Sequence, residues 1–204
     1  MAKGFLLIIS GPAGTGKGTV CKELLNRNSD ILYSVSATTR KPRIGEVEGE
    51  NYFFIEKNKF ESMVENDEFL EHAYVHTNYY GTPRGFVSEE VEKGEIVLLE
   101  IDVQGALQVK NNYSEAVFIF LLPPTMEELK NRIIKRGTET EEDINRRFEN
   151  AFKELDFVGK YDYFVVNDKI EEAVSDIETI IRAEKLRVKR HSDIKNKVIS
   201  QGGR

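Results

Sequence analysis

A glycine-rich segment near the start of the chain has the residue types and spacing that bind phosphate. It reads Gly11-Pro12-Ala13-Gly14-Thr15-Gly16-Lys17 and matches the pattern G-x-x-x-x-G-K, between an apolar strand pattern and a helical pattern. Small residues let backbone N–H groups turn toward an anion, and the helix N-terminus adds positive potential. The lysine is expected to reach the outer phosphates of a nucleotide. The sequence therefore predicts a site for ATP phosphates.

Position 18 departs from the usual form of this motif. Gly18 stands where a serine or threonine hydroxyl normally helps to hold Mg²⁺, and Thr19 follows one position later. Glu100 and Asp102 end an apolar run, at the point where sheets of this type place their ligands. We therefore expect Mg²⁺ near Thr19 and Glu100, held directly or through water. A pair of acids on a solvated strand end is the alternative interpretation.

Two groups of arginines supply the local positive charge that a nucleotide pair requires. The net charge of the chain is −6, so its mean field cannot hold several phosphate charges. The first group is Arg40 with Arg43, and the second comprises Arg132, Arg136, Arg146 and Arg147. Arg132 and Arg136 share one helix face at spacing i, i+4, and guanidinium forks fit phosphate oxygens. A solvated basic face is the alternative, and it is the favoured interpretation for Arg146.

The elements that must position these residues alternate between strands and helices. Apolar patterns predict strands at 5–10, 31–36, 96–101, 116–122 and 163–166, and helical patterns occur at 17–28, 85–93, 104–111, 126–136, 141–157 and 170–190. Thr125 is expected to cap a helix, with Glu128 placed for a capping box. This alternation is typical of an α/β fold, here a P-loop three-layer sandwich with a parallel core sheet.

The stretch 37–83 interrupts the alternation. We expect a loop at 37–51, short strands at 52–54 and 69–75, a helix at 57–66 and a turn-rich loop at 78–83. The prediction is a single domain with a core of about 1–36, 84–136 and 144–190, an inserted small sub-domain at about 37–83, a helical lid whose tip is at about 137–143, and a basic tail at about 187–204.

Composition is that of an ordinary globular protein, with 40% hydrophobic and 31% charged residues. Cys21 is the one cysteine, so no intramolecular disulfide forms, and the cysteine and histidine spacing fits no zinc template. The apolar run 5–10 is too short for a membrane span and lacks a signal cleavage site. We expect a cytoplasmic protein. The last twenty residues carry a net charge of +6, and a solvated helix end is favoured there over a surface for nucleic acid or an acidic partner.

Several segments beyond the phosphate loop resemble the guanylate kinase family. They are SVSATTRKPR at 34–43, GE at 45–46, NY at 51–52, EFLE at 68–71, NYYGT at 78–82, EIDVQG at 100–105, PP at 123–124, RGTETE at 136–141 and VND at 166–168. The resemblance runs from the first strand to about residue 186. It is far more specific than a phosphate loop alone.

This resemblance implies a transferase that moves the γ-phosphate of ATP to GMP, giving ADP and GDP in purine nucleotide metabolism, with Mg²⁺. The GMP phosphate would be held by Arg40, Arg43, Tyr52 and Tyr80, and guanine would be read by Ser36, Glu71 and Thr82 with Asp102 nearby. The ATP phosphates would be held by Lys17, Arg132, Arg136 and Arg147, and Asn167 would lie near the adenine. Residues 37–83 would form the mobile GMP-binding sub-domain.

The chemistry of guanine supports the assignment of Glu71. Guanine presents two donors on its pairing edge, N1–H and the 2-amino group, and one carboxylate accepts both. Adenine offers an acceptor at N1 and no 2-amino group, so a desolvated Glu71 would be left unpaired. Two other functions stay open: a kinase for AMP, CMP or UMP, and a non-catalytic guanylate-kinase-like interaction domain. The small molecules ATP and GMP are the expected partners, without nucleic acid or membrane, and the oligomeric state is left open.

Overall fold

A computed structural model describes residues 3–75, 77–135, 141–191 and 193–201. In these residues the main sheet has five parallel strands in the order β2-β7-β1-β8-β9. The strands are β1 (Phe5–Ser10), β2 (Ile31–Tyr33), β7 (Ile96–Glu100), β8 (Val117–Leu122) and β9 (Tyr163–Val166). The predicted α/β fold with a parallel core sheet is confirmed.

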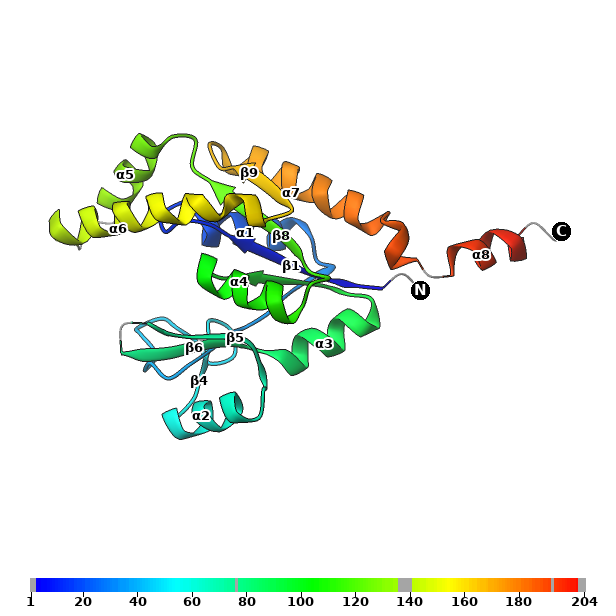
Figure 1. The fold of residues 1–204 in the computed structure, drawn as a ribbon, viewed down its shortest axis with the longest axis horizontal. Coiled ribbons are helices and arrows are strands. Elements are labelled where there is room, and N and C mark those ends of the chain that lie inside the picture. Colours follow the sequence, from blue (N-terminus) through cyan, green and yellow to red (C-terminus); the bar gives the residue numbers. More distant parts are fainter. Residues whose placement is uncertain (1–2, 76, 136–140, 192, 202–204) are drawn as a thin grey trace.

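Helices cover both faces of this sheet (Figure 1). The helices α1 (Lys17–Arg27) and α7 (Ile170–Lys185) cover one face, where Leu7 and Ile9 of β1 pack with Leu24 and Ile177. The helices α3 (Arg84–Lys93) and α4 (Val103–Asn112) cover the other face, packing with the alternate residues of β1. Every residue of β1 is buried, which explains its continuous apolar sequence.

A second sheet is built from the stretch that interrupts the alternation. Its strand order is β4-β3-β6-β5, with β3 (Ala37–Thr38), β4 (Phe53–Phe54), β5 (Phe69–Val75) and β6 (Asn78–Pro83). The helix α2 (Lys57–Glu65) covers this sheet with Phe60, whose ring stacks on Phe69 and Tyr79 at 4.5 Å and 5.2 Å between centroids. These residues form a small core separate from that of the main sheet, and the second sheet lies below the main sheet in Figure 1.

Two predictions for this stretch were wrong. The turn-rich loop expected at 78–83 is strand β6, which pairs with β5 along its length. The loop expected at 37–51 begins with the short strand β3, which pairs with both β4 and β6. Glycine and proline suggested turns in the local sequence, but pairing with a distant strand determines the structure.

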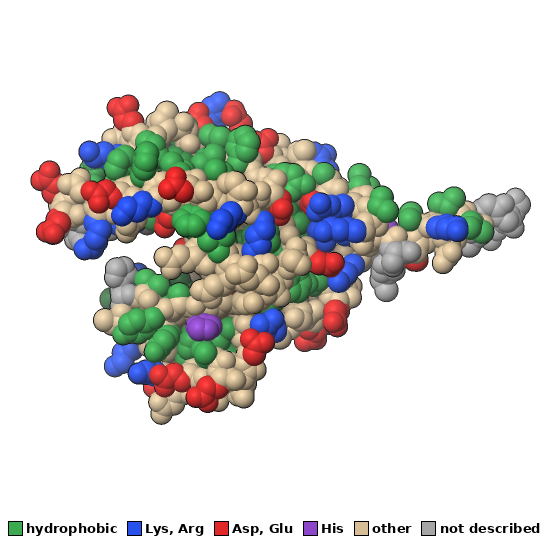
Figure 2. Space-filling model, in the orientation of Figure 1, with side chains coloured by type: hydrophobic (Ala, Val, Ile, Leu, Met, Phe, Trp, Pro, Cys, Tyr) green, Lys and Arg blue, Asp and Glu red, His purple; other side chains and the backbone are tan. Residues whose placement is uncertain are grey.

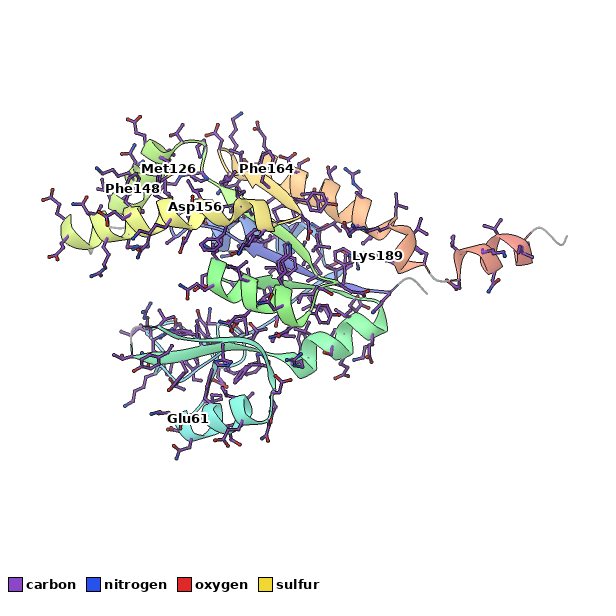
Figure 3. All side chains as sticks on the ribbon, in the orientation of Figure 1. Glu61, Met126, Phe148, Asp156, Phe164 and Lys189 are labelled. Carbon is purple, nitrogen blue, oxygen red and sulfur yellow. The ribbon has the colours of Figure 1, made fainter. Side chains whose placement is uncertain are left out.

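The helical region after β8 contains α5 (Met126–Ile134), α6 (Glu141–Glu154) and the short 3-10 helix η1 (Leu155–Lys160). Thr125 caps α5 as predicted, because its hydroxyl accepts a 3.0 Å bond from the backbone N–H of Glu128. Figure 3 labels Met126 of α5 and Phe148 of α6, which mark where the two helices lie side by side. Positions 137–140 of the predicted lid tip lie outside the described residues.

The end of the chain differs from the long helix expected at 170–190. The helix α7 ends at Lys185 and is followed by the 3-10 helix η2 (Val188–Arg190) and by α8 (Ile194–Gln201). Arg190 folds back and forms a 2.7 Å ion pair with Glu184, both almost fully buried, so a turn replaces the last helical residues. No helix among the described residues is long and apolar enough to cross a membrane.

Candidate active site

The phosphate loop connects the carboxyl end of β1 to α1. Gly11, Gly14 and Gly16 have φ angles of 143°, 93° and 90°, in the region that favours glycine. A Cβ on Gly11 would lie 2.4 Å from the carbonyl oxygen of Leu121, and a Cβ on Gly16 would lie 2.6 Å from Nδ2 of Asn167. The loop is therefore closely packed as well as sharply turned, and three of its positions require glycine.

Lys17 opens α1 and folds back over the loop. Its Nζ donates to the carbonyl oxygens of Gly11 at 2.6 Å and Pro12 at 3.1 Å. Burial lowers the pKa of Lys17, and nearby acids, Glu100 first, oppose that change. The ammonium group is thus held inside the loop by backbone oxygens, in the position from which a lysine can contact phosphates.

Glu100 occupies the space beside Gly18. A Cβ on Gly18 would lie 3.6 Å from both carboxylate oxygens of Glu100. Burial raises the pKa of Glu100, while Lys17 lowers it. A carboxylate therefore lies in van der Waals contact with position 18, where the usual hydroxyl is absent, and carboxylate oxygens suit a small hard cation. Thr19, the other predicted magnesium residue, is exposed on the first turn of α1.

A cavity of about 240 Å³ lies between the second sheet and the carboxyl end of β7. Figure 2 shows the surface indented between the part that contains α6 and the part that contains the second sheet. The cavity is lined by Ser36, Tyr52, Glu71, Tyr80 and Asp102, together with Ala73, Val75, Gly81, Glu100 and Ile101. The structure thus brings together five of the residues predicted to bind the substrate, from segments far apart in the sequence.

Glu71 is the buried acid of this cavity, with 7% of its surface exposed. It lies opposite Thr82 in the pairing of β5 with β6, and the Thr82 hydroxyl donates to Oε1 of Glu71 at 2.7 Å. Burial raises the pKa of Glu71 to about 7, Asp102 adds to the rise, and the bond from Thr82 opposes it. Thr82 therefore contributes to the cavity indirectly, because its hydroxyl orients the carboxylate of Glu71.

Arg40 is held at the edge of the cavity by an acid that the sequence analysis did not single out. Its Nη1 and Nη2 donate to the two carboxylate oxygens of Glu46, each at 2.9 Å. The guanidinium carbon lies 5.5 Å from the centroid of Tyr52, whose ring is 5.9 Å from that of Tyr80. The pairing holds the pKa of Arg40 above its usual range and lowers the pKa of Glu46 to about 2.

Arg43 contributes to the same turn through its backbone. Its N–H donates to Oε2 of Glu46 at 2.7 Å, while its side chain is exposed. Glu46 therefore organises both predicted phosphate-binding arginines. A signal was available, because Glu46 belongs to one of the segments that carry the family resemblance, but its pairing across six residues of loop follows no regular spacing.

Arg132 and Asn167 stand behind the phosphate loop. Nε of Arg132 donates to Glu128 at 2.8 Å, and its Nη1 donates to the carbonyl oxygen of Asn167 at 3.0 Å. Asn167 is 4% exposed, and its Nδ2 donates to the carbonyl oxygen of Thr15 at 2.8 Å. These contacts connect α5 and the end of β9 to the loop.

The structure describes only some of the remaining lid arginines. Arg147 is half-buried on α6 and Arg146 is exposed, while Arg136 lies outside the described residues. Two further groups near the site were missed from the sequence. Glu154 of α6 lies close enough to the loop for Lys17 to lower its pKa, which burial raises. Gly105 of α4 donates its N–H to Oδ1 of Asp102 at 2.8 Å.

Fold and site together define a class of enzyme. A parallel sheet whose central strand runs into a phosphate loop, with a cavity of about 240 Å³ against an inserted small sheet, is the arrangement of a P-loop nucleoside-monophosphate kinase. The family model described as guanylate kinase matches residues 3–184. The chain belongs to the guanylate kinase family, which confirms the predicted resemblance.

Individual relatives agree over nearly the whole chain. The guanylate kinase of Clostridium tetani is 61% identical over 193 residues, covering 95% of this chain and 92% of that protein. The guanylate kinase of Caldanaerobacter subterraneus is 55% identical over 196 residues, with coverage of 96% and 95%. Among solved structures, guanylate kinase from Anaplasma phagocytophilum has a TM-score of 0.79 at 36% identity and covers 97% of this chain and 94% of that one.

Proposed function

We propose that this chain transfers the γ-phosphate of ATP to GMP, producing ADP and GDP. Family membership carries the reaction class and the use of ATP as donor. The observation that supports GMP as the acceptor is the buried Glu71, which Thr82 orients within a cavity that Glu100 and Asp102 also line. Because ATP and GMP are cytoplasmic metabolites, we place the reaction in the cytoplasm.

For the donor, we assign the loop 11–17 with Gly18 and Thr19 to the ATP phosphates. Lys17 contacts the β- and γ-phosphates, and Arg132 and Arg147 close over them, joined by Arg136. The packing of Asn167 against Thr15 supports a contribution to the shape of the loop. Contact between Asn167 and the adenine stays a prediction.

For the acceptor, we assign the GMP phosphate to Arg40, Arg43, Tyr52 and Tyr80, and guanine to Ser36, Glu71 and Thr82 with Asp102 nearby. Glu71 accepts both donors of the guanine edge. An oxygen of the GMP phosphate then attacks the γ-phosphorus, and the bond from that phosphorus to the β-bridging oxygen breaks. The acceptor is already ionised, so positive side chains rather than a base supply the catalysis.

For the metal, we propose that Glu100 and Thr19 hold Mg²⁺, directly or through water. When bound, Mg²⁺ supplies positive charge to the donor phosphates. The support is the position of the Glu100 carboxylate beside Gly18, where a hydroxyl is absent. Glu100→Gln is expected to weaken Mn²⁺ binding in the presence of ADP about tenfold, as measured by electron paramagnetic resonance. Unchanged Mn²⁺ affinity would remove Glu100 from the metal site.

For the sub-domain, we propose that residues 37–83 and the lid near 137–143 move toward the core when both nucleotides bind. The support is chemical, since the two substrates must meet away from water. Small-angle scattering of the free chain and of its complex with GMP and a non-hydrolysable ATP analogue should show a smaller radius of gyration for the complex. Identical curves would contradict closure.

The deciding experiment measures ADP formation from ATP and Mg²⁺ with GMP, AMP, CMP and UMP in parallel. We expect strong activity with GMP alone, and a loss of GMP preference in Glu71→Gln. Activity with another monophosphate would leave the assignment of the phosphate loop intact and contradict the assignment of the base-recognition residues. Inactivity with all four, in a folded sample, would favour an interaction domain.

A further inference from the structure

Gly105 lies in the first turn of α4, directly behind the carboxylate of Glu71. A Cβ at this position would lie 3.0 Å from Oε2 of Glu71 and 3.4 Å from Oδ1 of Asp102. Separations of that size are shorter than nearly all real Cβ contacts, so one group would have to move. The absence of a side chain at position 105 therefore leaves the space that the Glu71 carboxylate occupies.

Backbone conformation does not account for this glycine. Gly105 is in regular helix, and it is not among the glycines with positive φ angles. Glycine inside a helix costs about 1 kcal/mol relative to alanine. Alanine would thus suit the helix better, and the space that Glu71 occupies is the structural reason for glycine.

The strand that carries Glu71 is tied to the same face of α4 on both sides of that residue. The backbone N–H of His72 donates to Oε1 of Gln108 at 3.1 Å. Nδ2 of Asn112 donates to the carbonyl oxygen of Leu70 at 3.2 Å. Gly105, Gln108 and Asn112 are spaced i, i+3, i+7, so they lie along one face of the helix.

Glu71 therefore has little freedom to retreat from an added methyl group. Its backbone neighbours are bonded to α4, and its Oε1 accepts the bond from Thr82. The direction left to Oε2 is into the cavity, where the base edge would bind. A shift of a few tenths of an ångström there changes the geometry of two hydrogen bonds at once.

We propose that Gly105, Gln108 and Asn112 form a positioning face of α4 that sets guanine specificity by fixing the Glu71 carboxylate. These residues do not touch the reacting atoms and act through Glu71. The inference rests on the proposed function, because it assumes that Glu71 reads the base.

The test is Gly105→Ala, assayed for GMP, AMP and ATP kinetics and for thermal stability. We expect the KM for GMP to rise about tenfold, as for a weakened bond to a charged group. The KM for ATP should stay unchanged, and the Tm should change little, because the helix propensity gained with alanine offsets the strain of the close approach to Glu71. If Gly105 served only the packing of the fold, Gly105→Ala would instead lower the Tm and leave the KM for GMP unchanged.

Gly85→Ala is the matched control. Gly85 lies in α3, and a Cβ there would meet nothing within 4 Å. This variant gains the same helix propensity without approaching Glu71, so both KM values should match those of the unmodified chain. Gln108→Ala is the second variant, and it should raise the KM for GMP by loosening β5 even if Gly105→Ala fails to fold.

A double-mutant cycle with Glu71→Gln separates the possible failures. If Gly105 acts through Glu71, the effect of Gly105→Ala on the KM for GMP should largely disappear in the Glu71→Gln background. The inference would be overturned, and the proposed function kept, by either of two results. One is an unchanged KM for GMP in both Gly105→Ala and Gln108→Ala. The other is an effect of Gly105→Ala that has the same size with Glu71 and with Glu71→Gln. If Glu71→Gln itself leaves the GMP/AMP ratio unchanged, the proposed base recognition fails instead.

Discussion

Lys17 is the residue whose removal should most affect chemistry with least effect on the fold. Its ammonium group contacts loop carbonyls and belongs to no part of the hydrophobic core. Lys17→Ala should lower kcat by about 10²–10³-fold, because charge stabilisation in the transition state is lost. Steady-state kinetics give the loss, and far-UV circular dichroism should match that of the unmodified chain. Turnover above a tenth of normal would contradict the assignment.

Glu71 should make GMP use depend on pH. The pKa of Glu71 is about 7 in the free folded chain, above its ordinary value of 4.5. Guanine requires the ionised carboxylate, so kcat/KM for GMP should fall up to about tenfold for each pH unit below 7. The GMP phosphate also titrates near pH 6, as phosphate esters do. The Glu71→Gln variant keeps the titration of the GMP phosphate. Subtracting its pH profile of kcat/KM from that of the unmodified chain therefore isolates the titration of the Glu71 carboxyl group. Equal profiles would rule out titration of Glu71.

The same pKa predicts the direction of a stability change. The folded chain keeps a proton on Glu71 up to about pH 7, while the unfolded chain loses it near 4.5. Stability from this group is therefore complete below about pH 4.5 and is lost as the pH rises to about 7. Glu71→Gln should accordingly raise the Tm more at pH 8 than at pH 5, as differential scanning fluorimetry can measure.

Residues whose types carry the chemistry could be predicted from the sequence, but several of their supporting contacts could not. The loop glycines and Lys17 follow a local pattern, and Glu71 was proposed from the family resemblance, which the donors of guanine support. Glu46 and Gly105 matter because of what lies across from them in space. Pairing with Arg40 through an irregular loop and a close approach between α4 and β5 leave no periodic signal.

At the scale of elements, the phosphate loop depends on support from the end of β9. Asn167→Ala would leave the buried carbonyl of Thr15 without its donor, at a cost of about 1–3 kcal/mol. We expect a lower Tm and a KM for ATP that rises more than the KM for GMP. Asn150→Ala, on the exposed surface of α6, is the control and should change neither. Equal effects on both KM values would indicate general damage to the fold.

The strands β1, β7 and β8 were predictable because they are almost entirely buried and therefore mainly apolar. The bounds of β1, β5 and β9 were predicted as observed, although β5 and β9 are only partly buried. Strand β6 was missed because Gly81 and Pro83 dominate its local pattern, although both pair with β5, Gly81 opposite His72 and Pro83 opposite Phe69. The end of α7 was missed because a buried ion pair, formed only in the folded chain, stops the helix.

At the scale of the whole molecule, Arg190 connects the segment after α7 to the first residues of the chain. Arg190 pairs with Glu184 and lies over the Phe5 ring at 4.4 Å, and its carbonyl oxygen accepts a bond from Lys3. Arg190→Met should lower the free energy of unfolding by about 1–3 kcal/mol, because the buried Glu184 loses one charged partner and keeps only Arg187 and Tyr163. Denaturant unfolding measures this loss, while both KM values should stay the same.

The exposed pair of Lys169 and Glu172 provides the comparison. About two thirds of each side chain is exposed, at 67% and 65%. Lys169→Met should therefore change stability by less than about 1 kcal/mol. A loss as large as that from Arg190→Met would show that burial is not what gives the terminal pair its strength.

The pairing of Arg40 with Glu46 has a consequence for which molecules can enter the acceptor site. The arginine is not a vacant cation awaiting a ligand, since both of its terminal nitrogens already face a carboxylate. In the proposed site the GMP phosphate must compete with that carboxylate, and a dianion competes far better than a neutral molecule. Guanosine, which offers the same base without the phosphate, would leave the Arg40–Glu46 pair intact and gain no binding energy from Arg40. The proposed site would therefore discriminate by the charge of the ligand as well as by its base.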